Sequence, residues 1–115
     1  MFELSQLKDV IVIGVHGELD PHNVAEIDSL LTTVLQNHSG KVVLDLSDLH
    51  HLHFKLVPHL VDRVVELQCA GGDLKVAAGS SYINNILMAM GFEETFYPTV
   101  ADAVLSFNPP EEEWH

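Results

Sequence analysis

Short apolar runs alternate along the chain with longer stretches whose apolar residues recur every three or four positions. Residues 10–15 are continuously apolar and largely β-branched, as is typical of a strand buried on both faces. Residues 41–46 and 74–78 predict two further strands of the same kind, and residues 2–4 predict a short first strand. These four runs are therefore expected to form the strands of a sheet.

Helical spacing marks four segments between and after these strands. Asp20 followed by Pro21 is typical of an N-cap and a first helical residue, and it predicts a helix that ends at residues 39–40. A second helix is expected to begin near Lys55, and Ser80 and Thr99 predict the N-caps of a third and a fourth helix. The apolar face predicted for the second helix consists of Val57, Leu60, Val61, Val64 and Leu67.

The order of these elements predicts the fold class. Strands separated by amphipathic helices favour a largely parallel sheet with helices packed against it. The length of 115 residues is that of one ordinary domain. We therefore predict an α/β fold with a mixed, largely parallel sheet over residues 1–108. Residues 109–115, which include three glutamates and a tryptophan, predict an acidic and flexible tail.

The charge of the chain excludes some classes of partner. Five Lys and Arg residues against 17 Asp and Glu residues give a formal net charge of −12. Such a chain repels phosphate groups, so neither nucleic acid nor an anionic membrane is an expected partner. No apolar stretch approaches the roughly 20 residues that span a bilayer, and the first residues lack the pattern of a signal peptide. We therefore expect a cytoplasmic protein without direct membrane insertion.

Three segments carry a resemblance to a known family. Gly17-Glu18-Leu19-Asp20 follows the strand at residues 10–15 and precedes a long helix. Residues 41–49 read KVVLDLSDL, and residues 83–107 combine a helix, Gly91, Phe92, Phe96 and a last helix. In order and spacing these segments resemble the STAS domains of bacterial anti-sigma factor antagonists, over about residues 2–107.

The resemblance implies a protein-binding module and not an enzyme. In signalling members of the family a kinase phosphorylates a Ser or Thr in an Asp-Ser-Ser-Gly motif at the start of the second helix, and the added charge switches partner binding. The matching positions here are His53, Phe54, Lys55 and Leu56, and no Ser, Thr or Tyr occurs within residues 48–79. Phe54 and Lys55 thus occupy the hydroxyl positions, and we predict that the phosphorylation switch is absent.

The resemblance also implies where a partner would bind. The expected contact residues are His53, Phe54, Lys55 and Leu56, with Asp20 and His22 of the preceding strand-to-helix turn as neighbours. The expected partner is an anti-sigma factor-like kinase or another STAS protein, in a bacterial regulatory system that controls transcription. An accessory subunit of a transporter ATPase is an open alternative, and the sequence predicts no oligomeric state.

Four histidines, His50, His51, His53 and His59, gather around the start of the second helix. Imidazole is a common ligand of Zn, Ni and Cu, so a metal or small-molecule sensor is a further alternative, with His51, His53 and His59 as candidate ligands. Protonation of these side chains would also make a partner interface sensitive to pH. Solvated loop histidines are the simpler explanation of the pattern, and neither a cofactor nor a catalytic residue is predicted.

Overall fold

Five strands form the main sheet of the chain, whose computed structural model describes residues 2–37 and 40–107. Their spatial order is β1-β2-β4-β6-β7, with β1 antiparallel to β2 and the other neighbours parallel to each other. The mixed, largely parallel sheet predicted from the sequence is thereby confirmed. The strands are β1 (Phe2–Leu7), β2 (Val10–Val15), β4 (Lys41–Asp45), β6 (Asp73–Ala77) and β7 (Phe96–Tyr97).

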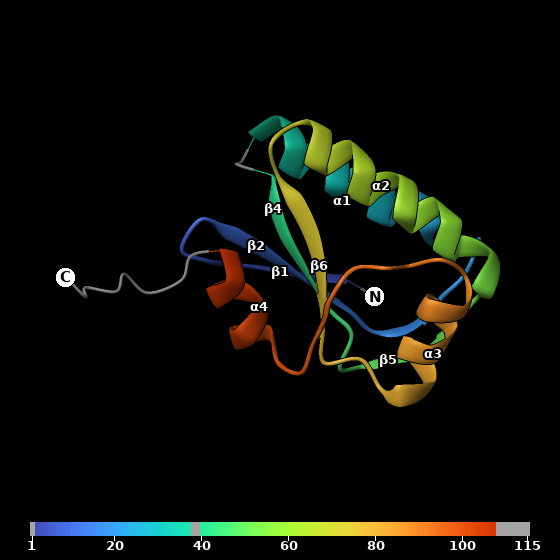
Figure 1. Cartoon of the computed structure of the whole chain (residues 1–115). Coiled ribbons are helices and arrows are strands. Elements are labelled where there is room, and N and C mark those ends of the chain that lie inside the picture. Colours follow the sequence, from blue (N-terminus) through green and yellow to red (C-terminus); the bar gives the residue numbers. More distant parts are fainter. Residues whose placement is uncertain (1, 38–39, 108–115) are drawn as a thin grey trace.

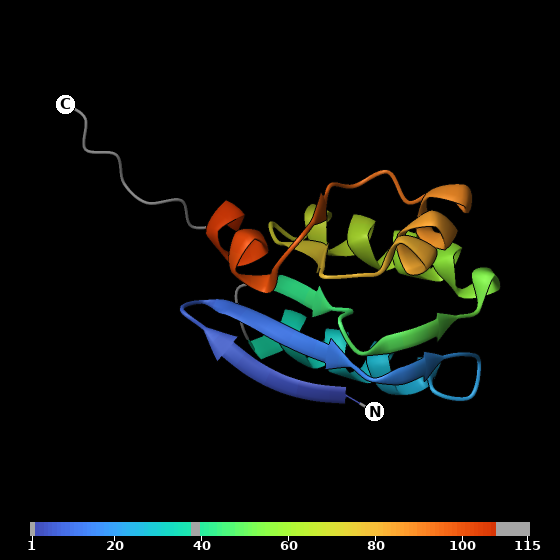
Figure 2. The same cartoon turned by 90° about the horizontal axis from the view of Figure 1, so that it is seen from below.

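Helices cover both faces of this sheet. The helices α1 and α2 lie side by side over one face, whereas α4 lies on the opposite face (Figures 1 and 2). The short helix α3 packs beside the strand that leads into α2. The helix bounds are α1 (Val24–Asn37), α2 (Val57–Cys69), α3 (Ser81–Ala89) and α4 (Val100–Phe107).

The central strands are buried on both sides. Ile11 and Ile13 of β2 belong to a large apolar core under α1 and α2, whereas Val10 and Val12 belong to a smaller core under α4. Successive side chains of a strand point to opposite faces, so two covered faces require a continuously apolar run. The apolar face predicted for α2 is also confirmed, because all five of its residues lie in or against the larger core.

A second, two-stranded sheet departs from the prediction. Two short strands, β3 (Gly17–Leu19) and β5 (Leu49–Leu52), pair in parallel with each other. The first and last residues of β5 are buried, and the two histidines between them are exposed. The sequence of β5 therefore lacks the alternation of apolar and polar residues that marks a half-buried strand. Residues 109–115 and the predicted end of the first helix at residue 39 lie outside the described residues.

Three predicted helix starts agree with the structure. Ser80 Oγ accepts a hydrogen bond from the N–H of Ile83 at 3.2 Å, and Thr99 Oγ1 accepts one from the N–H of Asp102 at 3.0 Å. These two N-caps are confirmed. The second helix begins as a single 3-10 turn, η1 (Phe54–Leu56), that runs directly into α2.

Two neighbouring glycines before β6 have different structural roles. The N–H of Asp73 donates a hydrogen bond to Gly40 O at 3.0 Å, and a Cβ on Gly72 would overlap that same carbonyl oxygen. Gly71 has a φ of +92° but no heavy atom near the position of a Cβ. Gly72 therefore allows the starts of β4 and β6 to approach each other, whereas Gly71 supplies a left-handed backbone.

We predict that Gly72→Ala lowers the free energy of unfolding by roughly 2–4 kcal/mol, because two backbone segments must move apart. The matched control Gly71→Ala is expected to cost about 1 kcal/mol, since only the left-handed conformation is disfavoured there. Urea denaturation of both variants measures the difference. Equal losses in the two variants would contradict the close approach at Gly72.

Candidate functional site: the start of helix α2

The pairing of β3 with β5 brings the two candidate loops together. Leu19 is opposite Leu52, and the N–H of His53 donates a hydrogen bond to Leu19 O at 3.0 Å. Leu19 and Leu52 are both buried, which anchors the ends of both strands in the core. The turn after β3 and the start of η1 therefore leave this small sheet next to each other.

Asp20 and His22 lie in that turn and not in a helix. Asp20 Oδ1 accepts a hydrogen bond from the N–H of His22 at 2.9 Å, and Asn23 Oδ1 accepts one from the N–H of Asp20 at 2.9 Å. The Asn23 amide also donates to Glu18 O at 2.7 Å. These side-chain bonds close a turn that competes with helix formation. The prediction of Pro21 as the first helical residue is therefore wrong, and α1 begins only after Asn23.

His53 caps η1 and supports an exposed aromatic side chain. Its Nδ1 accepts a hydrogen bond from the N–H of Lys55 at 3.2 Å, and its ring stacks on that of Phe54 with centroids 5.3 Å apart. Phe54 nevertheless keeps 51% of its surface exposed. A large aromatic side chain that is held in position and half open to solvent has the properties of an interface anchor.

Lys55 adds a positive charge beside this aromatic ring. It is exposed, and among the described residues it makes no ion pair. By contrast, Lys41 pairs with Asp9 at 2.8 Å and Arg63 pairs with Glu66 at 3.0 Å. The ammonium group of Lys55 is therefore accessible to an acidic group of another molecule.

Leu56 does not belong to the exposed group. It is only 8% exposed and lies in the large apolar core. Successive side chains of a 3-10 turn point about 120° apart, so Leu56 faces inward when Phe54 and Lys55 face outward. The expectation that Leu56 contacts a partner is therefore corrected, because this side chain supports the start of α2 from inside.

A hydroxyl group reaches this region from α3. Tyr82 Oη lies 2.8 Å from His51 Nδ1, and the two rings stack with centroids 6.1 Å apart. His51 belongs to β5, the strand that leads into η1, so this contact joins α3 to that strand. Sequence reasoning missed Tyr82, because 31 residues separate it from His51.

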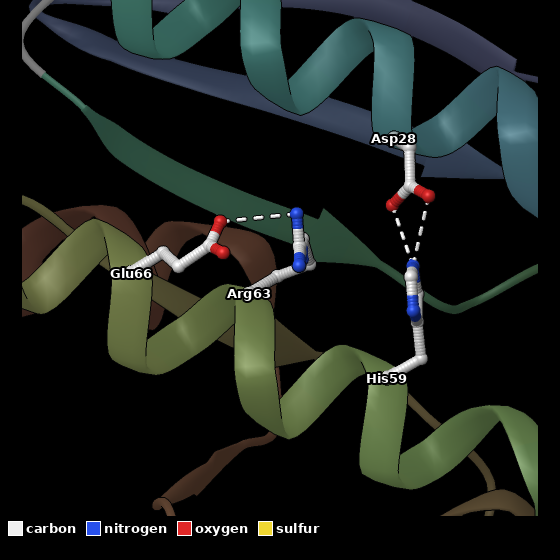
Figure 3. Close-up of polar contacts among 4 residues, drawn as sticks. All are labelled: Asp28, His59, Arg63 and Glu66. Carbon is white, nitrogen blue, oxygen red and sulfur yellow. Dashed lines mark hydrogen bonds and ion pairs between the residues drawn. The ribbon is translucent and has the colours of Figure 1, made fainter.

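The histidines considered as metal ligands have different partners. His51 contacts Tyr82, and His53 caps η1. His59, on α2, points to Asp28 of α1, and its Nε2 lies 2.7 and 2.9 Å from the two carboxylate oxygens (Figure 3). Within the part of the chain that the structure describes, no three His, Cys, Asp or Glu side chains are placed to hold a metal ion.

The α/β domain with an exposed helix start has close counterparts among proteins of known structure. The anti-sigma factor antagonist SpoIIAA in its unphosphorylated form matches with a TM-score of 0.83 and 19% identity, over 97% of this chain and all of its own. The phosphorylated form of SpoIIAA, a Bacillus cell fate determinant, matches with a TM-score of 0.74 and 21% identity, over 94% of this chain and all of its own.

A transporter domain has the same fold. The STAS domain of a SulP transporter from Vibrio cholerae matches with a TM-score of 0.69 and 13% identity, over 90% of this chain and 84% of its own. The match to the STAS domain family covers residues 1–103, and the chain belongs to this family. STAS domains are generally non-catalytic regulatory or interaction modules. None of the described helices is both long and apolar enough to cross a membrane.

We predict that the His59–Asp28 pair couples α2 to α1 with a free energy of about 1 kcal/mol, because both side chains are about one-third exposed and the single Nε2 group is within hydrogen-bond distance of both carboxylate oxygens. A double-mutant cycle with Asp28→Ala and His59→Ala, followed by urea denaturation, measures this coupling. The control cycle with Arg63→Ala and Glu66→Ala, within α2, should give about 0.3 kcal/mol. A coupling no larger than that of the control would refute the prediction.

Proposed function

We propose that the chain is a non-catalytic protein-binding module of a bacterial regulatory system, similar in role to an anti-sigma factor antagonist and acting in the cytoplasm. Its docking surface consists of His53, Phe54 and Lys55, with Asp20 and His22 as neighbours. The observation that carries the proposal is Phe54, which the His53 ring holds in position at the start of α2 while half of its surface stays exposed.

The chemistry of this surface defines what a partner must offer. Burial of Phe54 requires an apolar pocket, and Lys55 favours an acidic group next to that pocket. An anti-sigma factor-like kinase or another STAS protein is the partner class that we propose, with control of transcription as the outcome. Leu56 contributes indirectly, because it fixes the start of α2 against the core.

The proposed module differs from a phosphorylation switch. A phosphate ester requires a hydroxyl group, and the motif positions at the start of α2 hold Phe54 and Lys55. Tyr82, whose hydroxyl group contacts His51, belongs to α3 and not to these motif positions. We therefore infer that binding at the docking surface depends on the amounts and affinities of the partners and not on a covalent charge at these positions.

We predict that Phe54→Ala and Lys55→Glu each weaken capture of the native partner from host extract about tenfold or more, through loss of the aromatic anchor and reversal of the charge. Quantitative mass spectrometry of the captured proteins measures the effect. Met88→Ala is the matched control, because Met88 is 52% exposed on α3 and is not part of the docking surface. If neither change at η1 alters capture of any protein, the surface assignment fails.

We also predict that incubation of the purified chain with a cognate anti-sigma factor kinase and ATP transfers no phosphate to residues 48–79. This segment contains no Ser, Thr or Tyr to accept one. Phosphopeptide mapping by mass spectrometry is the measurement, with a STAS protein that carries the Asp-Ser-Ser-Gly motif as the positive control. Stoichiometric phosphate within this segment would contradict the predicted loss of the switch.

A second candidate function is that of an accessory subunit of a transport ATPase. The fold that the chain shares with the STAS domain of a SulP transporter from Vibrio cholerae supports a link with transport, and the ATPase as partner is our own addition. The same capture experiment separates the two candidates by the identity of the partner. A transport ATPase lost from the Phe54→Ala sample would favour the second candidate, and a kinase or STAS protein would favour the first.

A further inference from the structure

We propose that a groove along α2 binds a segment of another protein that carries an aliphatic side chain next to a basic one. The groove has a volume of about 210 Å³ and lies between α2 and residues 91–94, which follow α3. Figure 1 shows this orange segment running beside α2. None of the residues that line the groove belongs to the docking surface at η1, so the inference does not depend on the proposed function.

Most of the groove is apolar. Val61, Val64 and Val65 of α2 line one side, and Phe92 lines the other side. Val64 and Phe92 are each only 2% exposed and form the floor, whereas Val65 is 50% exposed. Half of the Val65 surface is thus open to water at the rim. An aliphatic side chain seated in the groove would remove this surface from water, which is favourable.

A glycine turn holds the opposite wall of the groove in place. The N–H of Phe92 donates a hydrogen bond to Leu87 O at 2.9 Å. Gly91 has a φ of +100°, the left-handed conformation that is common directly after the last turn of a helix. The turn buries Phe92 and leads Glu93 and Glu94 along the groove. The groove is therefore formed by the chain alone and needs no partner to shape it.

The charge of the groove is negative. Glu93 and Glu94 line it, and no Lys, Arg or His does. Glu94 is only partly exposed, and its Oε1 lies 3.5 Å from the neutral side-chain amide of Gln68. Among the described residues, neither glutamate forms an ion pair. A partly buried carboxylate without a cation is unfavourable, and a basic side chain of a partner would remove this cost.

The chain itself offers no suitable occupant, so the proposed occupant belongs to another protein. A second copy has a net charge of −12, and the three glutamates at residues 111–113 would be repelled by Glu93 and Glu94. A hydrated inorganic cation has no hydrocarbon to place against three valines. A foreign segment with aliphatic and basic side chains matches both the apolar walls and the negative rim.

Binding of synthetic peptides to the full chain, followed by NMR chemical shifts up to millimolar peptide, tests the proposal. The probe is a short helical peptide with leucine and arginine on one face, and in two matched peptides serine replaces leucine or glutamate replaces arginine. The probe is expected to shift the signals of Val61, Val65 and residues 92–94. It should bind about tenfold or more tightly than either matched peptide, because each of these lacks one of the two interactions.

Variants matched in charge test the role of the two glutamates. Glu93→Gln combined with Glu94→Gln is expected to weaken binding of the probe about tenfold or more. Glu26→Gln combined with Asp102→Asn removes the same number of charges from exposed positions of α1 and α4, and this control should bind like the wild type. Equal weakening in both double variants would mean that the net charge attracts the probe, and it would overturn the proposal.

A second matched pair tests the apolar wall. Val65→Lys is expected to weaken binding of the probe about tenfold or more, because a cation replaces the aliphatic rim. Leu105→Lys adds the same charge at a residue that is 45% exposed on α4, and it should bind the probe like the wild type. Phe54→Ala should also leave this binding unchanged, because Phe54 does not line the groove. Failure of this inference is thereby distinguished from failure of the proposed docking surface.

The wild-type chain allows a measurement that remains valid if the variants fold poorly. Cys69 is exposed, is the one cysteine of the chain and lies one helical turn after Val65. When the peptides carry a thiopyridyl disulfide at one end, the Cys69 thiolate attacks it, forms a mixed disulfide and releases thiopyridone. The probe should react about tenfold or more faster than the matched peptides, because binding raises its local concentration.

Several results would overturn the proposal. These are no binding of the probe at millimolar concentration, equal binding of the three peptides, shifts confined to another face, or unchanged binding in Val65→Lys or in the double glutamate variant. Spermidine that binds the groove as tightly as the probe would overturn it as well, because a site for a cation alone would then explain the two glutamates.

Discussion

Parallel pairing of two very short strands determines the geometry of the candidate site. β3 and β5 share few backbone bonds, but Leu19 and Leu52 at their paired ends are each 1% exposed. Burial of such side chains contributes roughly 1.5–3 kcal/mol each, which fixes the ends of both strands in the core. The hydrogen bond from the His53 N–H to Leu19 O then joins the two loops directly. Without this pairing, the turn of Asp20 and the start of η1 would have no fixed relation to each other.

The pattern of buried and exposed residues in each element explains which elements could be predicted from the sequence and which could not. The central strands and the apolar face of α2 are long enough, and buried enough, for their periodicity to identify them. The caps at Ser80 and Thr99 are local, so a few residues of sequence contain the whole interaction. β5 was missed because its central residues are two exposed histidines, and their exposure follows from the tertiary position of the strand.

The sequence predictions that were wrong or incomplete at the candidate site have related physical causes. Asp20-Pro21 has the composition of a helix start, but Asn23 binds the backbone of Glu18 and Asp20 and forms a turn instead. The resemblance to the family motif predicted that Leu56 is a contact residue. In the 3-10 turn, however, the side chain of Leu56 points into the apolar core. The contacts of His59 with Asp28 and of His51 with Tyr82 each join residues 31 positions apart. Such contacts depend on the packing of whole elements, which sequence spacing does not specify.

Stability alone does not account for the residues at the start of α2. A half-exposed Phe54 leaves apolar surface in water, and a positive charge such as Lys55 near the N-terminus of a helix is opposed by the helix dipole by about 0.3–1 kcal/mol. A small polar residue at either position would avoid these costs. His53 compensates only in part, because its cap and its stacked ring order the turn without covering Phe54. Both costs are removed when an apolar pocket covers the ring and an acidic group meets the ammonium, which is the chemistry of a bound protein partner.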